Sequence, residues 1–270
     1  MQIDQIEFLT QHPKVKTARM RTEWLYTTER YPLYWHHIAK NGGTFFKNLL
    51  YVLDHDHAID RTGPTHDWDD HLVRPRGVSR DEVRQSAHGI IIMRNPLHRF
   101  LSVYFDKVYH GGGARRPGIS REFLDTHDLH QSPDLSAEGH TENCLKLADW
   151  TALNIDGLTL AKPNWHLVPQ MHQLAQVHDL EFKVLTLEDF NWQLVHVLSD
   201  LVPDIAVKIG MVGKSNRSRK PVRKSEVMTP DLKNRLKEIY DDDFRVFREV
   251  RQFWRDAKEA PADRHGEGAG

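Results

Sequence analysis

A lysine followed by two glycines stands near the start of the chain, where a charged side chain and backbone N–H groups could bind an anion. The segment consists of Lys40, Asn41, Gly42, Gly43 and Thr44. Glycine lets a backbone approach a ligand closely, and the start of a helix directs N–H groups toward it. Lys40 adds a full charge, and the Thr44 hydroxyl can both cap the helix and contact an oxyanion. The segment predicts a phosphate- or sulfate-binding loop, with an ordinary surface turn as the alternative.

The residues on either side supply the strand and the helix that such a loop needs. Residues 34–38 are aromatic and apolar, which is typical of a short buried strand. Apolar residues then recur at helical spacing and predict a helix that begins near Thr44. Because the lysine precedes the glycines, the segment lacks the G-x-x-x-x-G-K loop and the Mg²⁺ position that a kinase-like phosphotransferase needs.

A second strand-to-helix junction carries an arginine. Residues 87–93 are almost continuously apolar and predict a buried parallel strand, and Pro96 suits the first turn of a following helix. Arg94 would then lie at the carboxyl end of the strand, with Ser102 two turns into the helix. Ligands bind at this edge of an open α/β sheet, and arginine suits bidentate contact with a phosphate. The pattern therefore indicates an α/β fold with a central, mainly parallel sheet.

Composition narrows the function classes. The 270 residues are 39% hydrophobic and 28% charged with a net charge of −1, which suits a globular domain and gives no global signal for binding nucleic acid or membranes. Cys144 is the only cysteine, so an intrachain disulfide is excluded. The chain has no signal-peptide pattern and no apolar run of about 18 residues. We expect a cytoplasmic enzyme without a membrane span.

The 18 histidines raise the question of a metal site. The zinc motif H-E-x-x-H is missing, and the pair His55 and His57 has no third ligand at a recognisable spacing, so we expect no metal. Titratable residues concentrate instead in the polar stretch 61–71, just after the predicted anion-binding loop. His66 in this stretch is a candidate general base, because a histidine matches neutral pH.

The remaining segments complete a single predicted domain. We expect helices over residues 120–127 and 141–153, a strand and a helix from residue 182 onward, and a last helix over residues 230–257. The predicted organisation is one domain over residues 1–257, with an N-terminal arm over 1–30, a mostly helical acceptor-side lobe over 110–180, and a disordered tail over 258–270.

Two motifs carry a family resemblance. Residues 37–44 resemble the 5′-phosphosulfate loop of sulfotransferases that use 3′-phosphoadenosine 5′-phosphosulfate (PAPS), in the carbohydrate (Golgi-type) branch, whose loop reads H-x-P-K-x-G-G-T; Ala39 replaces the proline. The family's 3′-phosphate motif, R-x-P-x-x-R-x-x-S-x-Y, is matched by Arg94, Pro96, Arg99, Ser102 and Tyr104. The resemblance spans residues 34–250 and is to a soluble, bacterial-type member.

This resemblance implies a three-layer fold like that of P-loop NTPases and transfer of a sulfuryl group from PAPS to an acceptor hydroxyl, on a carbohydrate or a small metabolite, without a metal. It assigns the 5′ end of PAPS to Lys40, Asn41, Gly42, Gly43, Thr44 and Phe45. Arg94 and Ser102 would hold the 3′-phosphate, and Arg99 would brace the helix or pair with an acid.

Three further stretches resemble the family less closely. His66 and Trp68 are similar to a His-x-x-Trp stretch of heparan 6-O-sulfotransferases, whose histidine acts as the base. Residues 164–170 resemble N-x-H-W-x-P-Q, a stretch near the active cleft, which makes His166 a second candidate base. Arg217 and Ser218, in the basic stretch 214–224, resemble the family's C-terminal basic segment, which folds over the nucleotide or a polyanionic acceptor. A catalytically inactive nucleotide- or glycan-binding module of the same fold stays open as the alternative.

Overall fold

The computed structural model describes residues 1–11, 25–59, 80–85, 88–109, 119, 121–130, 132–212 and 222–260. Three of the predicted site residues lie outside the described residues: the candidate base His66 and the basic residues Arg217 and Ser218. The last ten residues, 261–270, lie outside them as well.

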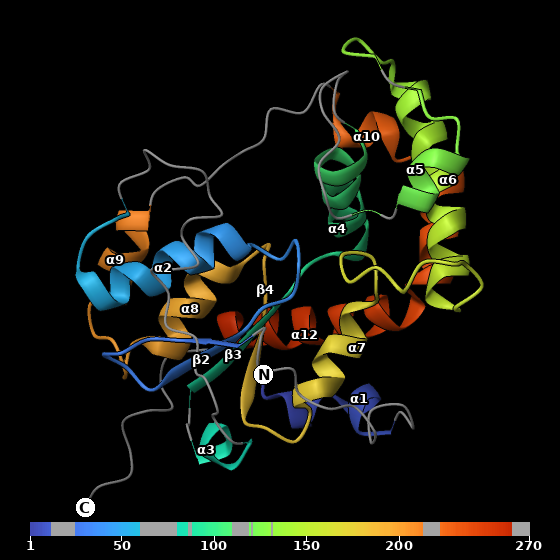
Figure 1. Cartoon of the computed structure of the whole chain (residues 1–270). Coiled ribbons are helices and arrows are strands. Elements are labelled where there is room, and N and C mark those ends of the chain that lie inside the picture. The colour runs from blue at the N-terminus through green and yellow to red at the C-terminus, as the bar shows by residue number, and fades with distance from the viewer. Residues whose placement is uncertain are drawn as a thin grey trace, which may run out of the picture.

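A four-stranded sheet in the order β1-β2-β3-β4 forms the centre of the fold (Figure 1). Its strands are β1 (Leu25–Thr27), β2 (Leu33–His36), β3 (His88–Met93) and β4 (Phe182–Thr186). The last three strands are parallel, and β1 pairs with β2 in the antiparallel direction. The predicted α/β fold with a central, mainly parallel sheet is therefore confirmed.

The strand β3 shows why its apolar run becomes a central strand. Its residues from Gly89 to Met93 are all buried, so both faces of the strand are covered. A side chain at Gly89 would not fit, because an added Cβ atom would lie 2.7 Å from Cδ2 of Phe182 on the neighbouring strand β4. The glycine thus permits the close packing that brings β3 and β4 into register.

Helices surround the sheet and build a second, all-helical region (Figure 1). The helices are α1 (Glu7–Gln11), α2 (Gly43–His55), α3 (Arg80–Gln85), α4 (Pro96–Val103), α5 (Arg121–Thr126), α6 (Ala137–Ile155), α7 (Gln170–Leu174), α8 (Phe190–Leu198), α9 (Ile205–Val212), α10 (Lys224–Val227), α11 (Pro230–Ile239) and α12 (Asp241–Glu259). Short turns of other types are η1 (Ile3–Gln5), the π-helical turn η5 (Tyr104–Val108) and η6 (Ala175–Val177).

Two hydrophobic cores correspond to these two regions. One joins the sheet to α2, α8, α9 and α12, and the other joins α4, η5, α5, α6 and α11. The helical core therefore also includes α4 and α11, which lie outside the predicted lobe over residues 110–180. The boundaries of the single domain over residues 1–257 stay a prediction.

Three predicted elements are corrected by the structure. Residues 25–27 form the edge strand β1 instead of belonging to an arm, because Leu25 and Tyr26 are buried in the sheet core. The predicted helix over 230–257 is two helices, broken at Tyr240, whose buried hydroxyl donates to the carbonyl of Leu167 at 2.7 Å. The helix α12 continues to Glu259, into the predicted tail, with Lys258 lying over the ring of Trp192.

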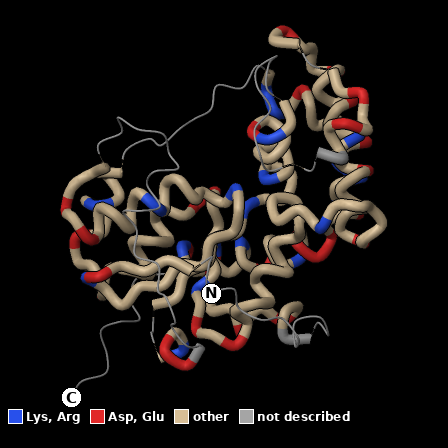
Figure 2. The backbone as a smooth tube through the Cα atoms, viewed as in Figure 1, with Lys and Arg blue, Asp and Glu red and all other residues tan. Residues whose placement is uncertain are grey.

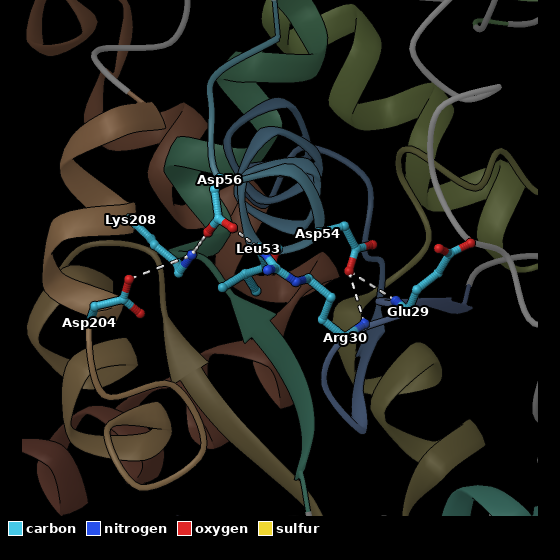
Figure 3. Close-up of polar contacts among 7 residues, drawn as sticks. All are labelled: Glu29, Arg30, Leu53, Asp54, Asp56, Asp204 and Lys208. Atoms are coloured by element: carbon cyan, nitrogen blue, oxygen red, sulfur yellow. Dashed lines mark hydrogen bonds and ion pairs between the residues drawn. The ribbon is translucent and has the colours of Figure 1, made fainter.

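A cluster of charged residues fastens the carboxyl end of α2 (Figure 3). Asp56 follows the helix in a left-handed conformation, with φ of 61°, and its carboxylate pairs with Arg30 and with Lys208 of α9. Asp54 accepts a hydrogen bond from the backbone N–H of Arg30 at 3.2 Å. These contacts join α2 to α9 and to the connection between β1 and β2.

A buried carboxylate, Asp243 of α12, holds the start of α7. Its two oxygens accept the backbone N–H groups of Gln170 and Met171, each at 2.8 Å. Since the residue before α7 is Pro169, which makes no side-chain cap, the cap comes from another helix. Desolvation raises the pKa of Asp243, while the charge of Arg99 and these hydrogen bonds oppose the rise.

We expect Asp243→Asn to lower the free energy of unfolding by about 2–4 kcal/mol. The amide cannot accept both N–H groups, and it leaves the buried guanidinium of Arg99 without this negative charge. Urea denaturation measures the loss. Asp241→Asn is the matched control, since Asp241 forms an exposed pair with Arg245 at 2.8 Å and such pairs contribute little. Equal stability of the two variants would contradict the capping role.

Candidate functional site

The turn between β2 and α2 presents backbone N–H groups at the carboxyl edge of the sheet. Lys40 and Gly42 both adopt left-handed conformations, with φ of 68° and 82°. The first intrahelical hydrogen bond runs from Phe46 N–H to the Gly42 carbonyl at 3.0 Å. The N–H groups of residues 43–45 precede this bond, so they can donate hydrogen bonds to an anion.

The start of α2 differs from the prediction in one respect. The helix begins at Gly43 with Gly42 as its N-cap, and no side chain makes a capping hydrogen bond there. Thr44 therefore lies within the first turn, and its predicted capping role is wrong. The reason is that Gly42 can adopt the left-handed conformation that turns the chain one residue earlier.

Gly42 is required by its left-handed conformation, and both Gly42 and Gly43 lie close to neighbouring side chains. A Cβ atom added at Gly42 would lie 2.7 Å from Cδ1 of Leu187, which follows β4. One added at Gly43 would lie 2.6 Å from Nε2 of His37. A larger residue at either position would push these side chains aside, and at position 42 the positive φ would strain it as well.

Arg94 follows β3 and contacts this turn directly. Its Nη1 donates to the backbone carbonyl of Lys40 at 2.8 Å. Its backbone N–H donates to Oε1 of Gln170 at 2.9 Å, and its carbonyl accepts from Nε2 of the same amide at 2.8 Å. The two motifs that the sequence singles out thus lie beside each other, because parallel strands end at the same edge of a sheet.

Asn41 and Arg99 brace the turn from inside the protein. The Asn41 side chain is buried and donates to the Ile92 carbonyl at 2.7 Å and to Gln170 at 2.6 Å. Arg99 is also buried, and it donates to the carbonyls of Ala39 at 3.1 Å and Val168 at 3.0 Å. Of the residues predicted to line the 5′ site, Asn41 therefore turns its side chain away from the ligand side.

Lys40 forms an ion pair with a carboxylate that the sequence analysis did not single out. Asp106 lies on the π-helical turn η5 and pairs with Lys40 Nζ, and its Oδ2 also lies 3.1 Å from Lys107 Nζ. Desolvation acts to raise the pKa of Asp106, but the hydrogen bonds and charges of both lysines outweigh it and lower the pKa to about 2. The carboxylate is therefore ionised at neutral pH.

The pKa of Lys40 is subject to opposing effects. Desolvation lowers the pKa of Lys40, and the charges of Lys107 and Arg94 lower it further, while the pairing with Asp106 raises it.

A π-helical turn is frequent at functional sites and adds one residue to a helix. Its presence after α4 explains why the helical spacing of the sequence did not place Asp106 against Lys40.

His166 lies near the same charged side chains as Lys40. Its ring is buried beside that of Trp165, with the ring centroids 3.8 Å apart. Desolvation lowers its pKa to about 3, and the positive charges of Lys40, Lys107 and Arg99 act in the same direction. Of the two candidate bases, His166 is the one in the described part of the chain, and its electrostatic environment is that of Lys40.

The edge around Arg94 holds further charged groups. Ser102 lies half-buried on α4, and Asn95 caps this helix by accepting the N–H of Leu97 at 3.0 Å. Desolvation lowers the pKa of Lys224 on α10, and the positive charge of Arg94 lowers it further. Figure 2 shows lysine and arginine positions recurring from the β2–α2 turn to α4 and α10. Lys224 is the last residue of the basic stretch 214–224, from which the sequence had indicated only Arg217 and Ser218 as site residues.

The described residues contain neither a candidate metal site nor a candidate membrane span. No three His, Cys, Asp or Glu side chains in this part of the chain gather in a way that could hold a metal ion. None of its helices combines the length and the apolar character that a membrane span requires.

Comparison with known proteins identifies the family. The family model described as the Sulfotransferase family matches residues 24–248, a range that includes every candidate site residue named above. No match was found among curated proteins or among solved structures. The match extends over most of the chain and over both strand ends that meet at Lys40 and Arg94. The chain therefore belongs to the sulfotransferase family.

Proposed function

We propose that this sulfotransferase moves the sulfuryl group of PAPS to a hydroxyl group of an acceptor. The observation that carries the donor assignment is the hydrogen bond from Arg94 to the Lys40 carbonyl at 2.8 Å. It brings two cationic strand ends side by side, where each could bind one phosphate group of the same nucleotide. Sulfuryl transfer needs mainly positioning and stabilisation of charge, which these groups supply.

Lys40 and the start of α2 would bind the end of the donor that reacts. The N–H groups of residues 43–45 donate hydrogen bonds to the 5′-phosphate, and Lys40 donates to the oxygen that bridges phosphorus and sulfur. As the acceptor oxygen bonds to sulfur, the bond from sulfur to the bridging oxygen breaks and its electron pair stays on the phosphate. Lys40 stabilises this developing charge, so no metal is required.

Arg94 and Ser102 would bind the 3′-phosphate at the other end of the nucleotide. Lys224 adds positive charge near Arg94, as its lowered pKa indicates. Arg217 and Ser218, outside the described residues, stay predicted contacts of the nucleotide. In this arrangement, the motif after β2 binds the 5′-phosphate of the donor and the motif after β3 binds the 3′-phosphate.

His166 would accept the proton that the acceptor hydroxyl loses. With its pKa lowered to about 3 by desolvation and by the neighbouring cations, the imidazole is neutral at pH 7 and has a lone pair available. His66 stays the other predicted base. Bound donor adds negative charge close to His166, which would raise its basicity at the moment when the proton must move.

The acceptor we propose is a carbohydrate or a glycosylated small molecule. Trp165 is 40% exposed and lies against His166, so a flat aromatic face borders the position of the base. Aromatic side chains combine a large apolar face with a polar edge, which suits the faces of a sugar ring. A cytoplasmic location, and an acceptor that is not a nucleic acid, complete the proposal.

Lys40→Ala should reduce kcat roughly 100- to 1,000-fold, because it removes the cation that stabilises the leaving phosphate. The measurement is the transfer of labelled sulfate from PAPS in an acceptor screen, with thermal denaturation as the check on folding. Lys233→Ala, an exposed lysine on α11, is the matched control and should keep full activity. Unchanged turnover in Lys40→Ala would rule out the mechanism.

Arg94→Gln should raise the KM for PAPS roughly 10- to 100-fold, since it removes charged hydrogen bonds to the 3′-phosphate. Adenosine 5′-phosphosulfate lacks that phosphate and serves as the internal control. Loss of the hydrogen bond to the Lys40 carbonyl would raise the KM for both donors alike, whereas loss of a contact with the 3′-phosphate would raise the KM for PAPS alone. Equal losses with the two donors would remove Arg94 from the 3′-phosphate site.

Titration calorimetry tests the donor class directly. The protein should bind 3′-phosphoadenosine 5′-phosphate without a divalent metal, and it should not prefer ATP with Mg²⁺. A preference for ATP with Mg²⁺ would favour a kinase-like enzyme. Binding without PAPS turnover in a broad acceptor screen would favour the inactive module.

A further inference from the structure

The hydrogen bonds of Asn164 identify its side-chain oxygen without any assumption about the orientation of the amide. Oδ1 lies 3.0 Å from the backbone nitrogen of His166, and a backbone N–H can only donate. The atom that it meets must therefore be the amide oxygen. The same oxygen lies 3.2 Å from Nδ1 of the His166 ring.

This contact determines where the imidazole carries its proton. Because the amide oxygen can only accept, Nδ1 of His166 must be the ring nitrogen that bears hydrogen. In a neutral imidazole the other nitrogen, Nε2, then has the lone pair. A general base needs a lone pair on the nitrogen that meets the substrate, so the tautomer matters for the reaction.

Asn164 is itself held by a second asparagine. Its backbone N–H donates to Oδ1 of Asn154 at 2.8 Å. Asn154 lies fully buried near the end of α6, and its amide nitrogen donates to Thr159 at 2.9 Å and to the carbonyl of Ala161 at 3.1 Å. The loop that leads to His166 is thereby tied to α6 through Thr159, Ala161 and Asn164.

The charged groups around His166 come from three elements. Lys40 belongs to the β2–α2 turn, Arg99 to α4, and Asp106 and Lys107 to the turn η5. Three of these four groups are cations and one is a carboxylate. They disfavour the imidazolium form in the free protein, so the neutral tautomer is the species whose orientation has to be controlled.

We propose that Asn164 is a positioning residue, which holds His166 with its Nδ1 proton toward the amide and its Nε2 lone pair toward the acceptor. The role of His166 as base rests on the proposed function, whereas the tautomer follows from the hydrogen bonds alone. Asn154 supports this arrangement by fixing the backbone of Asn164. In the reaction, Nε2 takes the acceptor proton while Asn164 keeps the Nδ1 proton in place.

Long-range ¹H–¹⁵N correlation spectra of the imidazole nitrogens test the tautomer in the wild-type protein. His166→Gln identifies the His166 signals by their loss. We expect the Nδ1–H form at pH 7 and no protonation down to about pH 5, since the pKa is lowered to about 3. A wild-type ring with its hydrogen on Nε2 would overturn the proposal, whatever the enzyme's activity.

Asn164→Asp provides a second test through charge. The carboxylate can accept the same two hydrogen bonds, and its negative charge stabilises the imidazolium, so His166 should protonate at a pH at least one unit higher than in the wild type. Asn234→Asp adds the same charge at an exposed position of α11 and should leave the His166 titration unchanged. An identical titration in all three proteins would show that Asn164 does not control the ring.

Activity gives a separate readout. Asn164→Ala should lower kcat roughly 10- to 100-fold with little change in the KM for PAPS, because it releases the ring without touching the donor site. The acid limb of the rate profile should move to higher pH in Asn164→Asp. If the tautomer is as expected but neither variant changes the rate, Asn164 orients a histidine that is not the base, and that part of the proposed function fails instead.

Discussion

One buried amide connects the parts of this structure that bind and react. The side chain of Gln170 pairs with the backbone N–H and carbonyl of Arg94 and accepts from the side chain of Asn41. Its own backbone N–H is held by the buried carboxylate of Asp243. The ends of two strands and the start of α7 are thus joined through one residue, because a buried polar group must find all its partners inside the protein.

The resulting site brings several positively charged side chains together in a buried environment. Burial lowers the pKa of Lys40, and the neighbouring cations add to this effect. Asp106 counters them with a single carboxylate presented by a π-helical turn. Lys40 is also held at a φ of 68°, a conformation that costs free energy in a residue with a side chain. The rigid braces around the turn, Asn41 and Arg99, maintain this arrangement at the expense of local stability.

Much of the framework could be predicted from local patterns. The apolar run before Arg94 became β3, the aromatic stretch before the glycines became β2, and Thr229 caps α11 near the predicted start of the last helical segment. These features depend on the period of apolar residues and on the turn chemistry of glycine and proline, which act between near neighbours. Boundaries were less exact, as the start of α2 and the break at Tyr240 show, since tertiary contacts decide them.

The sequence by itself determined that an anion-binding turn and an arginine follow two strands, because each motif is contiguous and its chemistry is local. Only the tertiary structure decided which groups surround Lys40. Asp106 reaches it through a π-helical turn, and the ring of His166 is set by Asn164 and, behind it, Asn154. These partners lie on separate elements, and their pairing depends on how helices and loops pack over one sheet edge. No spacing rule within a single segment encodes such contacts, because they arise only when burial brings distant polar groups together.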